Sequence, residues 1–238
     1  MPASRTTRAA GWALACVLIA ACNRGSAPDK RPAPAPAPAA NATPSSASET
    51  GLPKIVVLGD SLSAGYGLLE SQSLPAHLQR KLDAEGYKWE VVNAGISGDT
   101  TAAGLQRLDW AVNQGDVRIL VVELGANDGL RGLPVSEMKK NLGAIIERSR
   151  EKGITVLLAG MEAPPNFGPE YVVSFRQVYR DLAKEHKVTL LPFLLDKVAG
   201  VPALNQGDGI HPNIEGTAIV ADNVWNVLKP MVDATSGS

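Results

Sequence analysis

The sequence predicts an α/β domain in which helices cover both faces of a parallel sheet. From residue 54 onward, short apolar runs alternate with longer amphipathic stretches, which is the pattern of strands followed by helices. Runs such as residues 119–122 (ILVV) do not alternate polar with apolar side chains, so we expect both faces of the sheet to be covered. We predict five strands, over residues 55–58, 90–93, 119–124, 156–159 and 188–191.

Three of the intervening helices carry start and stop signals. Ser136 is predicted to cap one helix, which Gly153 ends, and Pro169 to begin the next. Asn213 is predicted to cap the last helix, which we expect to end before Pro230. Each helix has an apolar stripe predicted to face the core, formed by Met138, Leu142, Ile145 and Ile146; by Phe175, Val178, Tyr179 and Leu182; and by Ile219, Val220, Val224 and Leu228.

The balance of charge argues against a nucleic-acid partner. The 238 residues include 23 Lys and Arg against 24 Asp and Glu, so the chain is no polycation. Five of the basic and two of the acidic residues precede Gly51, which leaves 18 against 22 in the remainder. Residues 51–238 are predicted to form the single folded domain, and we expect it to be a monomer.

The N-terminus has the pattern of an export signal. Arg5 and Arg8 precede an apolar run over residues 9–21 that is too short to span a bilayer comfortably. The run ends in residues 18–22 (LIAAC), which resemble the lipobox of bacterial lipoproteins, so we predict a signal peptide over residues 1–21 and a lipid anchor on Cys22. By the same resemblance, Asn23 favours the outer membrane, and we expect the domain to face the periplasm. The alternative is an ordinary signal peptide with an incidental cysteine.

Residues 23–50 are rich in Pro, Ala and Ser and include an alternating Pro-Ala stretch. Such a segment buries little apolar area and favours extended polyproline II conformations. We therefore predict that residues 22–50 are a disordered tether, which at about 3.1 Å per residue reaches about 85 Å when fully extended. A ligand for a proline-recognising module is the alternative. The only cysteines, Cys16 and Cys22, precede the predicted domain, so no disulfide is expected in it.

Polar residues collect where the predicted strands end. The loops after the first, second and third strands contain residues 59–62 (GDSL), 95–100 (GISGDT) and 125–129 (GANDG). A longer loop after the fifth contains residues 208–212 (DGIHP). Because ligands of open α/β sheets bind beyond the carboxyl ends of the strands, we expect these four loops to form one site.

Together these residue types suit acyl transfer. A serine hydroxyl becomes a nucleophile when a histidine accepts its proton, and Ser61 and His211 are the candidates. Asp208 precedes His211 by three residues and can orient the imidazole. The backbone N–H groups of Ser61 and Gly98 and the side-chain amide of Asn127 are the candidate oxyanion donors. Taken singly, Ser61 could be a helix cap, and Gly98 and Asn127 turn formers.

The other histidines do not suggest a metal site. His77 and His186 lie in or near helix patterns, and we expect both to be solvated. The three histidines are dispersed and form no metal-binding motif, so no metal or other cofactor is expected.

The four blocks, in this order, resemble those of the SGNH hydrolases of the GDSL type. The residues that carry the resemblance are Ser61, Gly98, Asn127 and His211, with Asp208 in the last block, and the likeness extends from about Lys54 to Leu228. It implies a three-layer α/β/α sandwich with a flavodoxin-like strand order, 2-1-3-4-5. It is closest to the bacterial periplasmic thioesterases, arylesterases and lysophospholipases, which implies hydrolysis of acyl esters and thioesters. The lipobox and the tether depart from that soluble pattern.

A shallow acyl groove is the expected substrate site. Residues 161–168 correspond to a substrate loop of the family but differ from it at several positions, which leaves the preferred acyl length open. The predicted walls of the groove are Tyr66, Leu68, Leu69, Met161, Pro164 and Phe167.

Two other functions stay open at this point. Related domains remove acetyl groups from carbohydrates or peptidoglycan, and a non-catalytic flavodoxin-like module could hold a phosphorylated ligand. Neither a Gly-x-Gly-x-x-Gly nor a Walker loop is present to support the second. A Gly-x-Ser-x-Gly elbow is also absent, which argues against an α/β-hydrolase.

Overall fold

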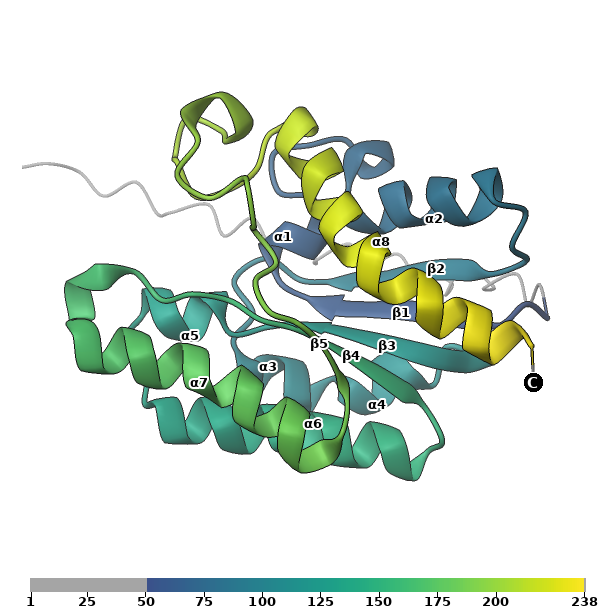
Figure 1. Ribbon diagram of the computed structural model, residues 1–238, viewed down its shortest axis with the longest axis horizontal. Helices are drawn as coiled ribbons and strands as arrows, with labels where there is room; N and C mark the ends of the chain where they lie inside the picture. Colours follow the sequence, from purple (N-terminus) through teal and green to yellow (C-terminus); the bar gives the residue numbers. More distant parts are fainter. Residues whose placement is uncertain (1–50, 238) are drawn as a thin grey trace, which may run out of the picture. The chain divides into compact units, whose positions relative to one another are not determined.

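The structure, a computed structural model, describes residues 51–237, so the predictions for the export signal, Cys22 and the tether lie outside the described residues. Five parallel strands form one sheet in the order β2-β1-β3-β4-β5, which confirms the predicted fold class (Figure 1). They are β1 (Lys54–Gly59), β2 (Glu90–Gly95), β3 (Val117–Glu123), β4 (Thr155–Ala159) and β5 (Thr189–Leu191).

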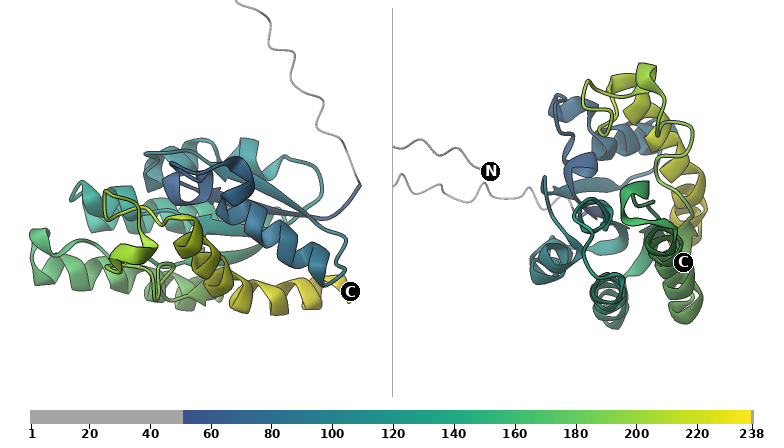
Figure 2. Two further views of the ribbon diagram at one scale, coloured as in Figure 1. Left: turned by 90° about the horizontal axis from the view of Figure 1, so that it is seen from above. Right: turned by 90° about the vertical axis from the view of Figure 1, so that its left-hand side faces the viewer.

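Helices cover both faces of the sheet, as the unbroken apolar runs in the strands require (Figure 2). One face is covered by α2 (Leu74–Ala84) and α8 (Ile214–Ser236). The other is covered by α3 (Thr101–Gln106), α4 (Leu108–Val112), α6 (Val135–Glu151) and α7 (Pro169–His186). None of the helices within residues 51–237 combines the length and apolarity needed to span a bilayer.

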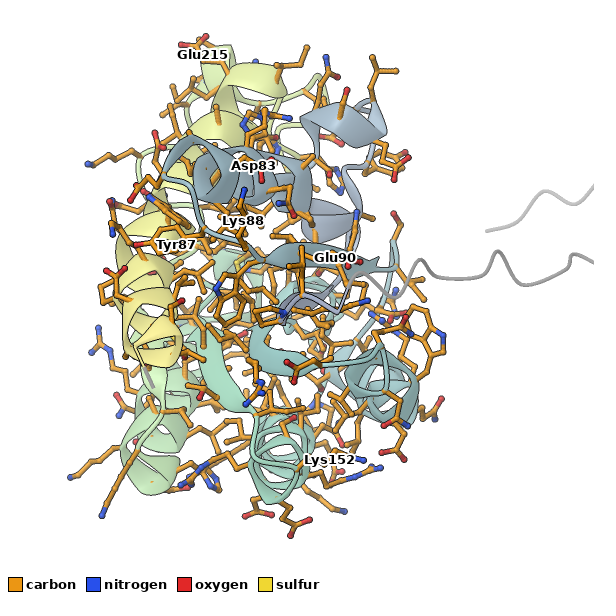
Figure 3. The ribbon with its side chains drawn as sticks, turned by 90° about the vertical axis from the view of Figure 1, so that its right-hand side faces the viewer. Asp83, Tyr87, Lys88, Glu90, Lys152 and Glu215 are labelled. Carbon is orange, nitrogen blue, oxygen red and sulfur yellow. The ribbon has the colours of Figure 1, made fainter. Side chains whose placement is uncertain are left out.

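Short elements lie at or near the carboxyl ends of the strands and shape the loops there. They are α1 (Ser61–Ala64), α5 (Ala126–Leu130) and the 3₁₀ turns η1 (Glu70–Gln72), η2 (Pro165–Phe167) and η3 (Pro202–Leu204). Figure 3 shows the opposite end of the domain, where Tyr87, Lys88 and Glu90 lie beside the start of β2.

The core is formed by the central strands and the helix stripes. Every residue of β1 is buried, and residues 119–122 of β3 are fully buried. Each large apolar side chain taken out of water in this way contributes about 1.5–3 kcal/mol. The stripe residues predicted from the sequence are buried, except Ile219, which packs against the core but is only partly buried. This packing makes the sheet a rigid base for the loops at its carboxyl edge.

Helix α6 starts differently from the prediction. It begins at Val135, with Pro134 rather than Ser136 in the cap position, and no side chain bonds the first turn as a cap. Proline fits this position because its fixed φ angle, −57° here, suits entry into a helix. The predicted end is close to the observed one, since α6 stops at Glu151 and Gly153 adopts a left-handed φ of 76°.

Helix α8 is longer than predicted, because it continues through Pro230 to Ser236. A proline inside a helix leaves the carbonyl four residues earlier without its donor, here that of Asn226. Both Pro230 and Asn226 are exposed, so water can satisfy that carbonyl. Met231 and Val232 beyond the proline are buried, and their packing favours continuation of the helix.

The two remaining histidines are less solvated than predicted. His77 is partly buried, and its Nε2 atom is buried without a hydrogen-bond partner. Burial lowers the pKa of His77, and the nearby charge of Arg80 adds to the effect. The side chain of His186 is 16% exposed and lies 3.9 Å from the carboxylate of Glu147.

Candidate active site

Ser61 lies where β1 turns into the short helix α1. Asp60 caps this helix, its Oδ1 atom accepting the N–H of Leu62 at 3.0 Å. Gly59 has no room for a side chain, because a Cβ atom there would lie 2.3 Å from Ser63 Oγ and 2.4 Å from Glu123 Oε2. The tight turn therefore places Ser61 as the first residue of α1, two positions beyond the buried end of β1.

The loop before α8 places an imidazole and a carboxylate together. The Oδ1 atom of Asp208 accepts the backbone N–H groups of Ile210 at 2.9 Å and His211 at 3.0 Å. Its Oδ2 atom lies 2.7 Å from His211 Nδ1. The N–H of His211, its ring and the N–H of Ile210 lower the pKa of Asp208 to about 2, so this carboxylate stays ionised at neutral pH.

The imidazole of His211 connects this carboxylate to the serine. Its Nε2 atom lies 2.9 Å from Ser61 Oγ. A proton on Nδ1, held by Asp208, leaves Nε2 free to accept from the hydroxyl. The structure thus brings Ser61, His211 and Asp208 into one hydrogen-bonded series, although 150 residues separate the serine from the histidine.

Gln206 and Tyr66 support the histidine, and the sequence analysis did not assign them this role. The N–H of Gln206 donates to the carbonyl of His211 at 2.7 Å. Its side-chain amide donates to the carbonyl of Tyr66 at 2.7 Å and to that of Pro212 at 2.9 Å. The Tyr66 ring packs against the imidazole, with ring centroids 4.6 Å apart. No motif signals these contacts, and those made by Tyr66 depend on how two distant loops meet.

The candidate oxyanion donors border one cavity, which lies beside Ser61. Ser61, Gly98 and Asn127 all line it. Gly98 has a φ of 88°, a conformation that favours glycine. One hydrogen of the Asn127 amide is donated to Asp60 Oδ2, at 3.0 Å, which leaves the second for a ligand.

Two buried carboxyl groups lie beneath these loops, and the sequence analysis assigned a role to neither. Asp60 and Glu123 are both fully buried. Glu123 Oε2 accepts Ser63 Oγ at 2.7 Å and the N–H of Asp60 at 3.1 Å, whereas Oε1 has no hydrogen-bond partner. Burial raises the pKa of Glu123 well above its usual range, which favours the protonated acid. Burial also raises the pKa of Asp60, to about 6.

The cavity beside Ser61 has a volume of about 610 Å³ and a mainly apolar wall. Among the predicted wall residues, Tyr66, Met161 and Pro164 line it. Its other apolar walls are Leu62, Ala126, Leu130, Ala163, Pro165, Phe193, Leu195, Ala199 and Ile210.

Three predicted wall residues lie elsewhere. Leu68 and Leu69 are not among the lining residues, and Leu69 is 67% exposed beside η1. Phe167 instead packs its ring against Tyr171, with centroids 5.3 Å apart. The spacing of apolar residues could not reveal which of them line the cavity. Within residues 51–237, no cluster of three or more acidic, His or Cys side chains could hold a metal ion.

A parallel α/β sandwich with a serine, a histidine and an aspartate in series beside an apolar cavity has the site architecture of a serine hydrolase. Residues 57–219 match the GDSL-like lipase/acylhydrolase family, and the chain belongs to that family.

Characterised proteins of similar sequence are esterases and thioesterases by name. Esterase TesA of Pseudomonas aeruginosa is 44% identical over 178 residues, which cover 75% of this chain and 89% of that protein. Thioesterase 1/protease 1/lysophospholipase L1 of Escherichia coli is 41% identical, covering 76% of this chain and 86% of that protein. The crystal structure of esterase EstA from Pseudoalteromonas, inhibited by monoethylphosphonate, is 36% identical with a TM-score of 0.72, covering 76% of this chain and 98% of that one.

Proposed function

We propose that this protein hydrolyses acyl esters and thioesters through an acyl-enzyme intermediate on Ser61. The observation that carries the proposal is the series from Asp208 through His211 to Ser61 Oγ, with contacts of 2.7 and 2.9 Å. The names of the relatives, which include an esterase and a thioesterase, support the same class of reaction.

In the first half of the reaction, Ser61 Oγ attacks the acyl carbonyl while His211 Nε2 takes the hydroxyl proton. Asp208 stabilises the imidazolium that forms, as its lowered pKa keeps it ionised. The carbonyl oxygen becomes an oxyanion, for which the N–H groups of Ser61 and Gly98 and the free hydrogen of Asn127 are the proposed donors. The C–O or C–S bond then breaks, and His211 returns the proton to the leaving alcohol or thiol.

In the second half, His211 removes a proton from water, which attacks the acyl group on Ser61. The same donors stabilise the second oxyanion. Its collapse releases the carboxylic acid, and His211 returns the proton to Ser61 Oγ.

The shape and chemistry of the cavity favour an acyl chain over an acetylated sugar. A sugar needs polar partners for its hydroxyl groups, whereas the wall is mainly apolar and includes Leu130, Met161 and Phe193. We therefore rank esters and thioesters with an extended acyl chain ahead of carbohydrate or peptidoglycan acetyl esters. Comparing the hydrolysis of p-nitrophenyl octanoate, palmitoyl-CoA, lysophosphatidylcholine and acetylated xylan tests this order.

We also propose that the domain is held at the bacterial envelope by a lipid on Cys22, with residues 23–50 as its tether. The basic residues, the apolar run and the LIAAC sequence support this proposal. A lipid anchor would place the enzyme at a membrane that contains acyl esters.

Changing Ser61 to Ala tests the proposed nucleophile. We expect kcat on a short p-nitrophenyl ester to fall by about 10⁶-fold, as when the serine of other serine hydrolases is removed. Loss of the amide in Asn127→Ala should cost about 10²–10³-fold, the usual effect of one oxyanion donor. A fluorophosphonate probe should label the parent protein on the peptide that contains Ser61.

The exposed Ser71 in η1 provides the control, because Ser71→Ala makes the same chemical change outside the cavity. Its activity should equal that of the parent. Hydrolysis that persists at the parent rate in both Ser61→Ala and Asn127→Ala would show that the proposal is wrong.

A further inference from the structure

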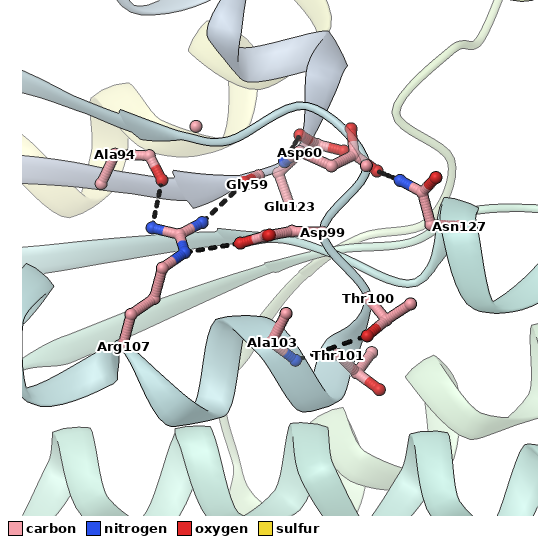
Figure 4. A network of polar contacts seen from close by, with 12 residues as sticks. Gly59, Asp60, Ala94, Asp99, Thr100, Thr101, Ala103, Arg107, Glu123 and Asn127 are labelled. Carbon is pink, nitrogen blue, oxygen red and sulfur yellow. Dashed lines mark hydrogen bonds and ion pairs between the residues drawn. The ribbon is translucent and has the colours of Figure 1, made fainter. Parts of the chain in front are cut away.

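The proposed oxyanion donors come from three separate segments of the chain. Ser61 follows β1, Gly98 follows β2, and Asn127 belongs to α5. Oxyanion stabilisation depends on donor positions to within a fraction of an ångström, so the relative positions of these segments must be fixed by contacts between them. Arg107 lies between α3 and α4 and extends its side chain beneath two of the three segments (Figure 4).

The guanidinium of Arg107 bonds each of three partners through a different nitrogen. Nε donates to Asp99 Oδ2 at 2.6 Å. Nη1 donates to the carbonyl of Ala94 at 2.6 Å, and Nη2 to the carbonyl of Gly59 at 2.8 Å. Figure 4 shows all three bonds converging on this one side chain.

Two of the partners of Arg107 lie within two residues of a proposed donor. Gly59 is the last residue of β1, two positions before Ser61, and Asp99 directly follows Gly98. The guanidinium therefore bridges the segment that carries the Ser61 N–H and the segment that carries the Gly98 N–H. The third donor is connected as well, because Thr101, two positions beyond Asp99, bonds the carboxylate of Asp128 through its N–H at 2.8 Å and its hydroxyl at 2.6 Å.

The bridge is shielded from water. The side chains of Arg107 and Asp99 are 15% and 13% exposed. Their pairing is therefore screened less than that of a surface ion pair. The planar guanidinium presents its donors in a fixed fork, which a lysine ammonium cannot reproduce.

We propose that Arg107 is a positioning residue, which through Asp99 and the carbonyls of Gly59 and Ala94 fixes the separation of the Ser61 and Gly98 N–H groups. The inference rests on the proposed function, in which those two groups stabilise the oxyanion. Arg107 itself does not line the cavity, so its effect on the reaction is indirect.

The test uses Arg107→Lys, Arg107→Ala and Asp99→Asn in the full chain, with kcat and KM measured on p-nitrophenyl butyrate. We expect kcat to fall by about 10- to 100-fold in the Arg107 variants, because a displacement of about 1 Å can cost 10²-fold. KM should change by less than about threefold, because the misplaced donors act mainly on the transition state. Guanidinium, added far below its denaturing concentration, should restore part of kcat in Arg107→Ala by occupying the vacated space.

The control is Arg148→Lys. Arg148 also pairs with an aspartate at 2.6 Å, Asp109, but on the exposed surface between α6 and α4. Its kcat should match that of the parent. Thermal unfolding of every variant distinguishes a protein that no longer folds from a folded protein with displaced oxyanion donors. If Arg107→Ala does not fold, Arg107→Lys and Asp99→Asn decide the question.

A folded Arg107→Lys protein whose kcat lies within about twofold of the parent value would overturn the inference. A rise in KM with no change in kcat would overturn it as well. The parent and Ser61→Ala proteins are measured in the same assay. If the parent is active and Ser61→Ala is not, the proposed function holds whatever the Arg107 variants show. If the parent shows no hydrolysis, both proposals fail.

Discussion

Glu123 is a carboxyl group in the core, directly below the turn that carries Ser61. It ends β3 and bonds the N–H of Asp60 and the hydroxyl of Ser63, both of which flank the serine. Burial of a charged carboxylate without a cation would be costly, so the protonated form is favoured. Its contacts suggest that Glu123 contributes to the shape of the turn rather than to proton transfer.

The protonation of Glu123 makes stability depend on pH. Burial raises its pKa well above the ordinary value of 4.5, so the folded protein keeps a proton that the unfolded chain loses as the pH rises past 4.5. Stability from this group is therefore greatest below pH 4.5 and is lost as the pH rises toward the folded pKa. The loss is about 1.4 kcal/mol for each pH unit over which only the unfolded form is deprotonated.

We predict that Glu123→Gln, which resembles the protonated acid, weakens this dependence. The free energy of unfolding in urea, measured from pH 5 to pH 8, should fall less steeply in the variant than in the parent. Glu151→Gln, an exposed change on α6, should follow the parent curve. Parallel curves for the parent and Glu123→Gln would show that Glu123 does not titrate as proposed.

The start of α8 connects the helix to the loop that carries the histidine. Asn213 caps α8, its Oδ1 atom accepting the N–H of Gly216 at 2.9 Å. Its Nδ2 atom donates to the carbonyl of Ala203 at 2.8 Å, in the same loop that contains Asp208. The cap thus secures both the helix and the segment immediately before it, where His211 lies.

We predict that Asn213→Ala destabilises the domain by about 1 kcal/mol, the usual cost of losing a cap. Urea unfolding provides the measurement. Asn226→Ala makes the same chemical change at an exposed position inside α8, where alanine is the better helix former, and should not destabilise the domain. Equal stability of Asn213→Ala and the parent would mean that water replaces the cap without loss.

The whole chain combines a folded hydrolase domain with the segment predicted to anchor it. A tether of residues 23–50 would extend up to about 85 Å, so the active site could turn toward an adjacent lipid surface. Several apolar side chains that line the cavity are exposed, among them Tyr66, Leu130 and Ile210. Such an arrangement suits substrates that partition into membranes.

Expression of the chain in a Gram-negative bacterium with an alkyne-tagged fatty acid tests the proposed anchor. We predict that the protein acquires the tag and sediments with membranes, and that Cys22→Ala abolishes the tag. Cys16→Ala is the matched control, because Cys16 lies in the predicted signal peptide, and it should keep the tag. An untagged parent protein would refute lipidation at Cys22.

Much of the fold follows from local patterns. The five predicted strands lie within a few residues of the observed bounds. The signal was strongest in β1 and β3, whose apolar runs are stable only when both faces are buried. Pro169 and Asn213 begin α7 and α8 as predicted, since their signals are local. Pro230 misled the prediction, because packing beyond it outweighed its local tendency to end the helix.

The residues that bear the proposed chemistry were also recognisable in the sequence, because parallel strands gather the loops after their carboxyl ends at one edge. The contacts that support those residues were not recognisable in the sequence. The fork of Arg107 and the burial of Glu123 both depend on which distant segments meet. Local sequence specifies the helices and strands and the polar residues that follow the strands. It does so through short-range steric preferences and the spacing of apolar residues. Contacts between those elements are set by long-range packing, which only the tertiary structure determines.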